Sequence, residues 1–194
     1  MKLNQIDRRE ALRRTALIMG GALTAPTMLG ILNGCTVTNE PNWTPVFFDQ
    51  NQAVTVMEIV DIIIPTTDTP GALDVGVPKF IESMIQDIYK EDAQKEFMDG
   101  LADFNTSVEV EHNSPFIELE QETKVAIITS LNEAAVTKTS TGMKEKFFMT
   151  IKELTVGGFC MSEAGATKVL KYDKTPGEYK GCIPFEEVGK TWAT

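Results

Sequence analysis

The sequence has very few of the residues that most often carry catalysis and metal binding. Its 194 residues include a single histidine, His112, and three cysteines, Cys35, Cys160 and Cys182. It has no G-x-G-x-x-G after a strand, no G-x-x-x-x-G-K-[ST], no C-x-x-C-H and no His/Cys cluster at zinc spacing. A lone histidine beside a predicted helix break is usually a solvated surface residue. We therefore expect this chain to bind no cofactor or metal and to have no catalytic residues of its own.

Basic residues are also scarce, and they are unevenly distributed. The chain has 18 Lys and Arg residues against 28 Asp and Glu residues, a formal charge of -10 that would repel a phosphate backbone. Nucleic acid is therefore excluded as a partner. Five of the basic residues but only two of the acidic ones precede Cys35, so 13 basic and 26 acidic residues remain from Cys35 onward, a charge of -13. The first 34 residues differ in kind from the rest.

Residues 1–34 have the organisation of an export signal. A polar start with four arginines precedes the uncharged run Ala16–Leu32, which is short for a membrane span, because a span needs about 20 apolar residues. A buried or spanning N-terminal helix is the alternative, but glycines and Pro26 within the run weaken any helix. The pair Arg8 and Arg9, followed by Leu12 and Arg13, resembles the twin-arginine motif.

The end of the signal resembles a bacterial lipobox. Leu32-Asn33-Gly34-Cys35 places a cysteine where the apolar run stops, which predicts lipidation of Cys35 and a membrane anchor without a span. Residues 35–45 would then form a polar tether. Export places the protein where disulfides persist, and two cysteines remain, Cys160 and Cys182. The sequence leaves open whether they form a disulfide or stay as two buried thiols.

The sequence of residues 46–194 predicts an all-α domain of about five helices with a loop-rich C-terminal tail. Apolar residues recur at spacings of three and four along each predicted helix. The expected helices are Gln50–Ile64 with Asp49 as N-cap, a helix from near Pro78 to Tyr89, one from Glu91 to a break at Asn113-Ser114-Pro115, one around Val125–Ala135, and one around Phe147–Leu154. We expect disruption at Gly157-Gly158, because glycine weakens a helix interior. From Tyr172 on, only a short turn at residues 185–189 is expected.

Two segments contain more turn and aromatic residues than linkers need. One is the loop Ile64–Ala72, and the other runs from Thr155 through the tail to Trp192. A turn and a helix end with aromatic packing would suffice for the fold alone, but ordered loops with prolines, glycines and exposed aromatics often contact a partner. The candidate partner interface comprises Pro65, Thr66, Asp68, Thr69, Pro70, Gly71, Phe159, Tyr172, Pro176, Gly177 and Trp192.

At these segments the chain resembles the gluconate 2-dehydrogenase subunit 3 family. The resemblance rests on Ile63-Ile64-Pro65, on Asp68-Thr69-Pro70-Gly71-Ala72, on Gly76-Val77 and on the block from Leu154 to Trp192 with Pro176-Gly177, Gly181-Cys182 and Pro184. It covers about residues 46–194. Cys160 and Met161 stand where relatives tend to have Tyr and Thr.

The resemblance implies a small accessory subunit of a periplasmic, membrane-associated sugar or polyol dehydrogenase. The large partner would resemble glucose-methanol-choline oxidoreductases, carry the FAD and the catalytic histidine, and pass electrons to a cytochrome c. The small subunit would carry the twin-arginine signal for both, since FAD is inserted into a protein that folds in the cytoplasm. The alternatives are a stand-alone periplasmic helical lipoprotein with a binding or structural role, and a small enzyme that uses carboxylates alone.

Overall fold

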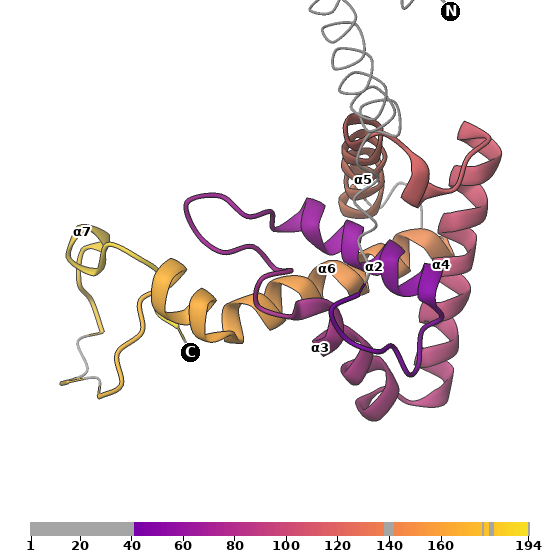
Figure 1. Ribbon diagram of the computed structural model, residues 1–194. Coiled ribbons are helices and arrows are strands. Elements are labelled where there is room, and N and C mark those ends of the chain that lie inside the picture. The colour runs from indigo at the N-terminus through magenta and orange to yellow at the C-terminus, as the bar shows by residue number, and fades with distance from the viewer. Residues whose placement is uncertain (1–40, 138–141, 176, 179–180, 194) are drawn as a thin grey trace, which may run out of the picture. The chain divides into compact units, whose positions relative to one another are not determined.

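One helix, α6 (Met143–Met161), organises the fold. The computed structural model describes residues 41–137, 142–175, 177–178 and 181–193. Within these residues α6 contacts four helices: α2 (Gln50–Ile63), α3 (Val77–Ser83), α4 (Glu91–His112) and α5 (Gln121–Val136) (Figure 1). A short 3-10 helix, Phe116–Glu118, precedes α5, and π-helical turns at Met84–Ile88 and Gly165–Val169 follow α3 and α6. The all-α prediction is confirmed. The signal segment, Arg8, Arg9, Cys35 and the start of the tether lie outside the described residues.

The predicted start of α2 and the predicted limits of α4 follow local signals and are confirmed. The Asp49 side chain accepts a hydrogen bond from Gln52 N at 2.8 Å, and the Gln52 side chain accepts one from Asp49 N at 2.9 Å. This reciprocal capping box satisfies two of the amide groups that a helix start leaves free. α4 ends at the predicted break, where Asn113 adopts a left-handed conformation with φ 52°. The short helix α7 (Phe185–Val188) occupies the turn expected at residues 185–189.

Phenylalanine rings connect the helices in the core. Phe97 and Phe147 lie edge to face with ring centroids 4.9 Å apart, and Phe104 contacts Phe116 in the same manner at 5.1 Å. All four rings are buried. Helices α4 and α6 pack tightly, since a Cβ on Gly100 would lie 2.5 Å from the Cβ of Phe147. Such edge-to-face pairs add to the stabilisation from apolar burial.

The predicted disruption at Gly157-Gly158 is wrong. α6 runs through both glycines and ends at Met161. A Cβ on Gly158 would lie 2.6 Å from the Phe80 ring, so the missing side chain lets α3 approach α6. Tertiary packing therefore compensates the low helix propensity of glycine, which is about 1 kcal/mol per residue against alanine.

A buried ion pair connects α2 to α5. The Lys124 ammonium pairs with the Glu58 carboxylate and also donates to Ile117 O at 2.9 Å. Burial raises the pKa of Glu58 and outweighs the opposite effect of Lys124. The two charges depend on each other, because either one would be left unpaired in the interior without its partner.

Candidate partner-binding surface

The connection between α2 and α3 is a closed and ordered loop. Ala72 N donates to Ile64 O at 2.9 Å, which joins the two ends of the segment, and Thr67 N donates to Thr69 O at 3.0 Å within it. The residues at its outer end, 65–68, are exposed. The loop therefore presents a fixed set of polar groups to solvent.

Asp74 holds this loop from just beyond its end. Its Oδ2 accepts hydrogen bonds from Thr66 Oγ1 at 2.7 Å and from Gly71 N at 2.8 Å. These two donors lower the pKa of Asp74, while burial and the charge of Asp74 raise the pKa of Asp61. Glycine is required at position 71, since a Cβ there would lie 2.5 Å from Thr66 N.

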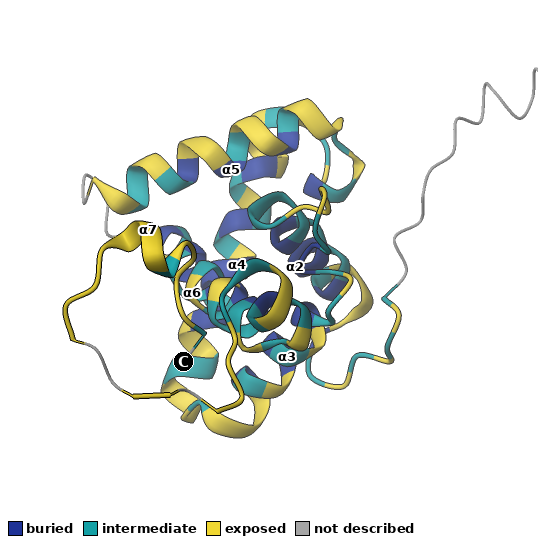
Figure 2. Cartoon of the chain, turned by 90° about the vertical axis from the view of Figure 1, so that its left-hand side faces the viewer, coloured by how far each residue is buried: buried dark blue, intermediate teal, exposed yellow. Residues whose placement is uncertain are grey.

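The segment after α6 is more exposed than the loop. After the π-helical turn Gly165–Val169, the chain makes an arm that returns at its end, where Lys171 N donates to Thr191 O at 2.8 Å and Ala193 N donates to Lys171 O at 2.9 Å. The Lys171 ammonium lies 4.2 Å from the centroid of the Trp192 ring, within the range of a cation–π interaction. Residues 172–187 that the structure describes are all exposed (Figure 2). We call residues 170–193 the C-terminal arm.

A cavity of about 310 Å³ lies between the start of α3 and the chain that follows α6. It is lined by Val75, three residues after the loop, and by Ser162, Glu163, Ala164, Thr167 and Lys168. Large apolar side chains are exposed on the last turns of α6 and along the C-terminal arm: Val156, Met161, Tyr172, Ile183, Phe185 and Trp192. Phe185 is 67% exposed. We call the loop 65–72, the end of α6 and the C-terminal arm together the loop–arm surface.

The residues predicted for a partner interface differ in exposure. Pro65, Thr66, Asp68, Tyr172, Gly177 and Trp192 are exposed, and Thr69 and Pro70 are half-buried. Gly71 and Phe159 are buried, because Gly71 closes the loop and Phe159 belongs to the hydrophobic core. These two residues are not available at the surface of the chain itself. Pro176 lies outside the described residues.

Cys160 and Cys182 are free thiols in the structure. Cys160 is half-buried at the end of α6 and Cys182 is exposed in the C-terminal arm. Within the described ranges no group of three or more His, Cys, Asp or Glu residues could hold a metal ion. No helix among these residues combines the length and the apolar character needed to cross a membrane.

A carboxylate that the sequence analysis did not single out holds the segment before α2. Glu82 Oε1 accepts hydrogen bonds from the backbone N–H groups of Val46, Phe47 and Phe48 at 2.8, 2.8 and 3.0 Å. Its Oε2 accepts one from Trp43 Nε1 at 2.6 Å. We call this arrangement the Glu82 clasp. Burial opposes ionisation of Glu82, but the four donors outweigh it and lower its pKa.

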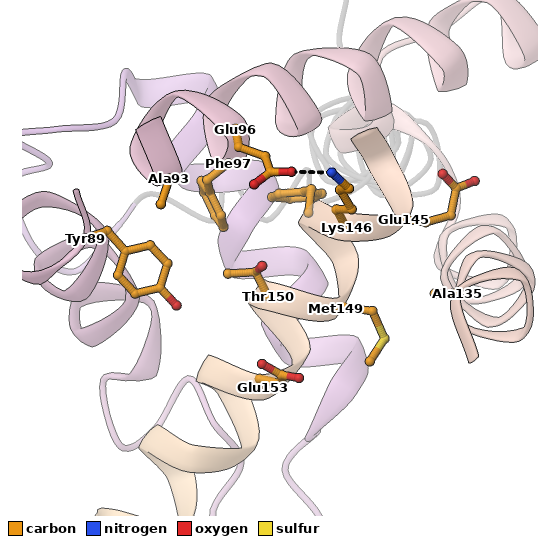
Figure 3. Close-up of a pocket in the computed structure, with 11 residues that line it drawn as sticks. Tyr89, Ala93, Glu96, Phe97, Ala135, Glu145, Lys146, Met149, Thr150 and Glu153 are labelled. Atoms are coloured by element: carbon orange, nitrogen blue, oxygen red, sulfur yellow. Dashed lines mark hydrogen bonds and ion pairs between the residues drawn. The ribbon is translucent and has the colours of Figure 1, made fainter. Parts of the chain in front are cut away.

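Two further cavities lie where α4, α5 and α6 meet, and Glu145 lines both. The larger, of about 510 Å³, extends between Tyr89, Phe97 and Glu153 (Figure 3). The smaller, of about 330 Å³, includes His112. Lys146 donates to Glu96 Oε1 at 2.6 Å at the edge of the larger cavity. We call the two cavities together the three-helix groove.

Comparison with known proteins identifies the family of this chain. Comparisons with curated proteins and with solved structures find no match. The family model described as gluconate 2-dehydrogenase subunit 3 matches residues 50–177. The matched range begins with α2 and includes the loop held by Asp74, all of α6 and the first part of the C-terminal arm. The chain therefore belongs to the gluconate 2-dehydrogenase subunit 3 family.

Proposed function

We propose that this protein is the non-catalytic small subunit of a periplasmic, membrane-associated, FAD-dependent sugar dehydrogenase. The family match over residues 50–177 carries the proposal, since the family is named for one subunit of a dehydrogenase complex. In this proposal the large subunit, of the glucose-methanol-choline type, binds FAD and performs the oxidation. The small subunit supports its export, its stability and its attachment to the membrane, and a cytochrome c accepts the electrons.

The sequence of the first 45 residues supports the export and anchoring roles. Arg8 and Arg9 would direct the folded complex to the twin-arginine pathway, and lipidation of Cys35 would hold it on the periplasmic side of a bacterial membrane. The Glu82 clasp fixes the chain from Trp43 to Phe48 on the body. Trp43, within the predicted tether of residues 35–45, is thus attached to α3.

The loop–arm surface supports the role of binding the large subunit. It combines a preformed polar loop with exposed aromatic residues, and aromatic residues are enriched at protein interfaces. The rigid loop loses little conformational entropy on binding, which favours affinity. The exposed apolar residues of the arm would be covered in the complex.

Purification from the native host tests this function. The full-length chain with a mild affinity tag is expressed in its own host, extracted from membranes with a gentle detergent, and examined for its absorption spectrum and its subunits. We expect a flavin spectrum and a second, much larger polypeptide. A colourless single band would contradict the accessory-subunit function and favour the stand-alone lipoprotein.

Matched variants test the separate roles. Cys35→Ser should release the complex from the membrane without separating the subunits, and Arg8→Lys with Arg9→Lys should retain it in the cytoplasm. Phe185→Ala should reduce the amount of co-purified flavoprotein. Val110→Ala is the control, because Val110 is 76% exposed on α4, a helix that is not part of the loop–arm surface. An equal effect of both substitutions would exclude the arm from the interface.

A further inference from the structure

We propose that the three-helix groove receives a cationic side chain, an arginine or a lysine, of the catalytic subunit, and that Glu145 is its partner. This inference rests on the proposed function and specifies a second contact point away from the loop–arm surface. Glu145 lies in the first turn of α6 and is only 6% exposed. Its Oε2 is buried and has no hydrogen-bond donor among the residues that the structure describes.

Glu145 is unusual because buried carboxylates normally accept several hydrogen bonds. Glu82 shows the normal arrangement in this chain, with four donors around its two oxygens. The N-terminal end of α6 provides part of the compensation for the Glu145 charge through the helix dipole. The helix dipole does not give Oε2 a direct partner. A cation from another chain could pair with this oxygen.

The neighbouring lysines of α6 do not fill this role. Lys144 and Lys146 are each adjacent to Glu145 in sequence, and adjacent residues of a helix project in different directions. Lys146 also pairs with Glu96 at the edge of the larger cavity (Figure 3). Figure 3 shows the Glu145 side chain projecting from α6 toward α5, on whose surface Ala135 lies. A cation that binds Glu145 would therefore enter between α5 and α6.

The charge and shape of the groove fit such a cation. Its lining includes four carboxylates, of Glu96, Glu111, Glu145 and Glu153, against the two ammonium groups of Lys144 and Lys146. Rotation about the last bond of a glutamate side chain is soft, so the carboxylate can turn toward either cavity. Apolar side chains of the groove, among them Ala135 and Met149 in the larger cavity and Leu131 in the smaller one, would cover the aliphatic stem of a lysine or an arginine.

Affinity measurements on the complex test the inference. The full-length wild-type chain, Glu145→Gln and Glu153→Gln are compared for binding to the flavoprotein purified from the host. Glu153 is the matched control because it lines the same groove but is exposed. Loss of a buried charge pair should weaken binding by about 30-fold or more for Glu145→Gln. Glu153→Gln should change it by less than about threefold.

The thermal midpoint of the isolated full-length chain separates a binding role from a structural one. Without the partner, Glu145→Gln should leave the midpoint unchanged or raise it, because it removes a buried and unpartnered charge. Unchanged affinity of Glu145→Gln would overturn the inference. A lowered midpoint that Lys138→Ala reproduces would also overturn the inference. It would mean that Lys138, which lies outside the described residues, is the partner of Glu145 within the chain. If wild-type chain and flavoprotein do not associate at all, the proposed function fails and this inference with it.

Discussion

Removal of the Glu82 carboxylate should destabilise the fold more than any other single polar substitution on α3. In Glu82→Ala the N–H groups of Val46, Phe47 and Phe48 lose their acceptor, and the Trp43 indole loses its partner. A hydrogen bond to a charged group contributes about 1.5–3 kcal/mol, but bonds to one shared carboxylate are not additive. We therefore expect a loss of about 4 kcal/mol in the free energy of unfolding, a substantial part of the 5–15 kcal/mol typical of a domain.

Glu82→Gln provides a finer test of the same geometry. The amide oxygen can still accept the three backbone N–H groups, but the amide NH₂ then faces the Trp43 indole N–H, which is also a donor. The expected cost is about 1–2 kcal/mol. Adding Trp43→Phe removes the opposed donor, so the double variant should lose less stability than the sum of the two single variants.

The pH dependence of the clasp has a definite sign. The pKa of Glu82 is lower in the folded chain than in the unfolded one, because its hydrogen-bond donors outweigh burial. Its contribution to stability is therefore complete above the ordinary pKa of glutamate and is lost as the pH falls through the lowered folded-state pKa. Glu82→Gln should reduce the loss of stability on acidification in this range.

Thermal and denaturant unfolding of the purified full-length chain, followed by circular dichroism, measures these effects. For a chain of this size, 4 kcal/mol corresponds to a decrease of roughly 8–16 °C in the melting temperature. A loss below about 1 kcal/mol for Glu82→Ala would refute the reasoning, as would a Glu82→Gln variant with the same acid sensitivity as the wild type.

Three further substitutions test the packing, the buried pair and the loop. Gly158→Val should destabilise the chain by about 2–4 kcal/mol, because its side chain would collide with Phe80, and restoration by Phe80→Ala would identify that contact as the cause. Lys124→Met should cost about 3–5 kcal/mol in denaturant unfolding because it leaves Glu58 unpaired, and adding Glu58→Leu should recover most of that loss. Asp74→Ala should change global stability by less than about 1 kcal/mol but increase hydrogen exchange and proteolysis in the loop 65–72, and an unchanged loop would contradict its role.

The sequence was most informative where structure depends on near neighbours. The capping box of Asp49 and Gln52 and the break at Asn113 involve residues at most a few positions apart, and both helix limits agree with the prediction. The disruption predicted at Gly157-Gly158 failed because helix propensity is local, whereas the contact of Gly158 with Phe80 joins two helices distant in sequence. Propensity is overruled wherever such packing dominates.

The same distinction explains what was missed at the surface. The loop residues were recognised from their turn chemistry, but Asp74, which holds them, lies outside the turn motif, and an acidic residue three positions after Gly71 was the available signal. Glu82 is 34 to 39 residues from its hydrogen-bond donors, and no local pattern marks it. The burial of Glu145 likewise depends on the meeting of three helices.

The placement of carboxylates suggests how an acidic chain orders its own surface for a partner. Asp74 closes the loop before α3 and Glu82 fixes the chain before α2, so both accept backbone N–H groups of segments that lie outside the helices, whereas Asp49 caps the first turn of α2. Such bonds order surface segments before any partner arrives, which reduces the entropy lost on association. Glu145 differs because it is buried without such a donor. Asp74 and Glu82 thus order surface segments within the chain, and Glu145, whose buried Oε2 has no donor among the described residues, is where we expect the partner to contribute charge.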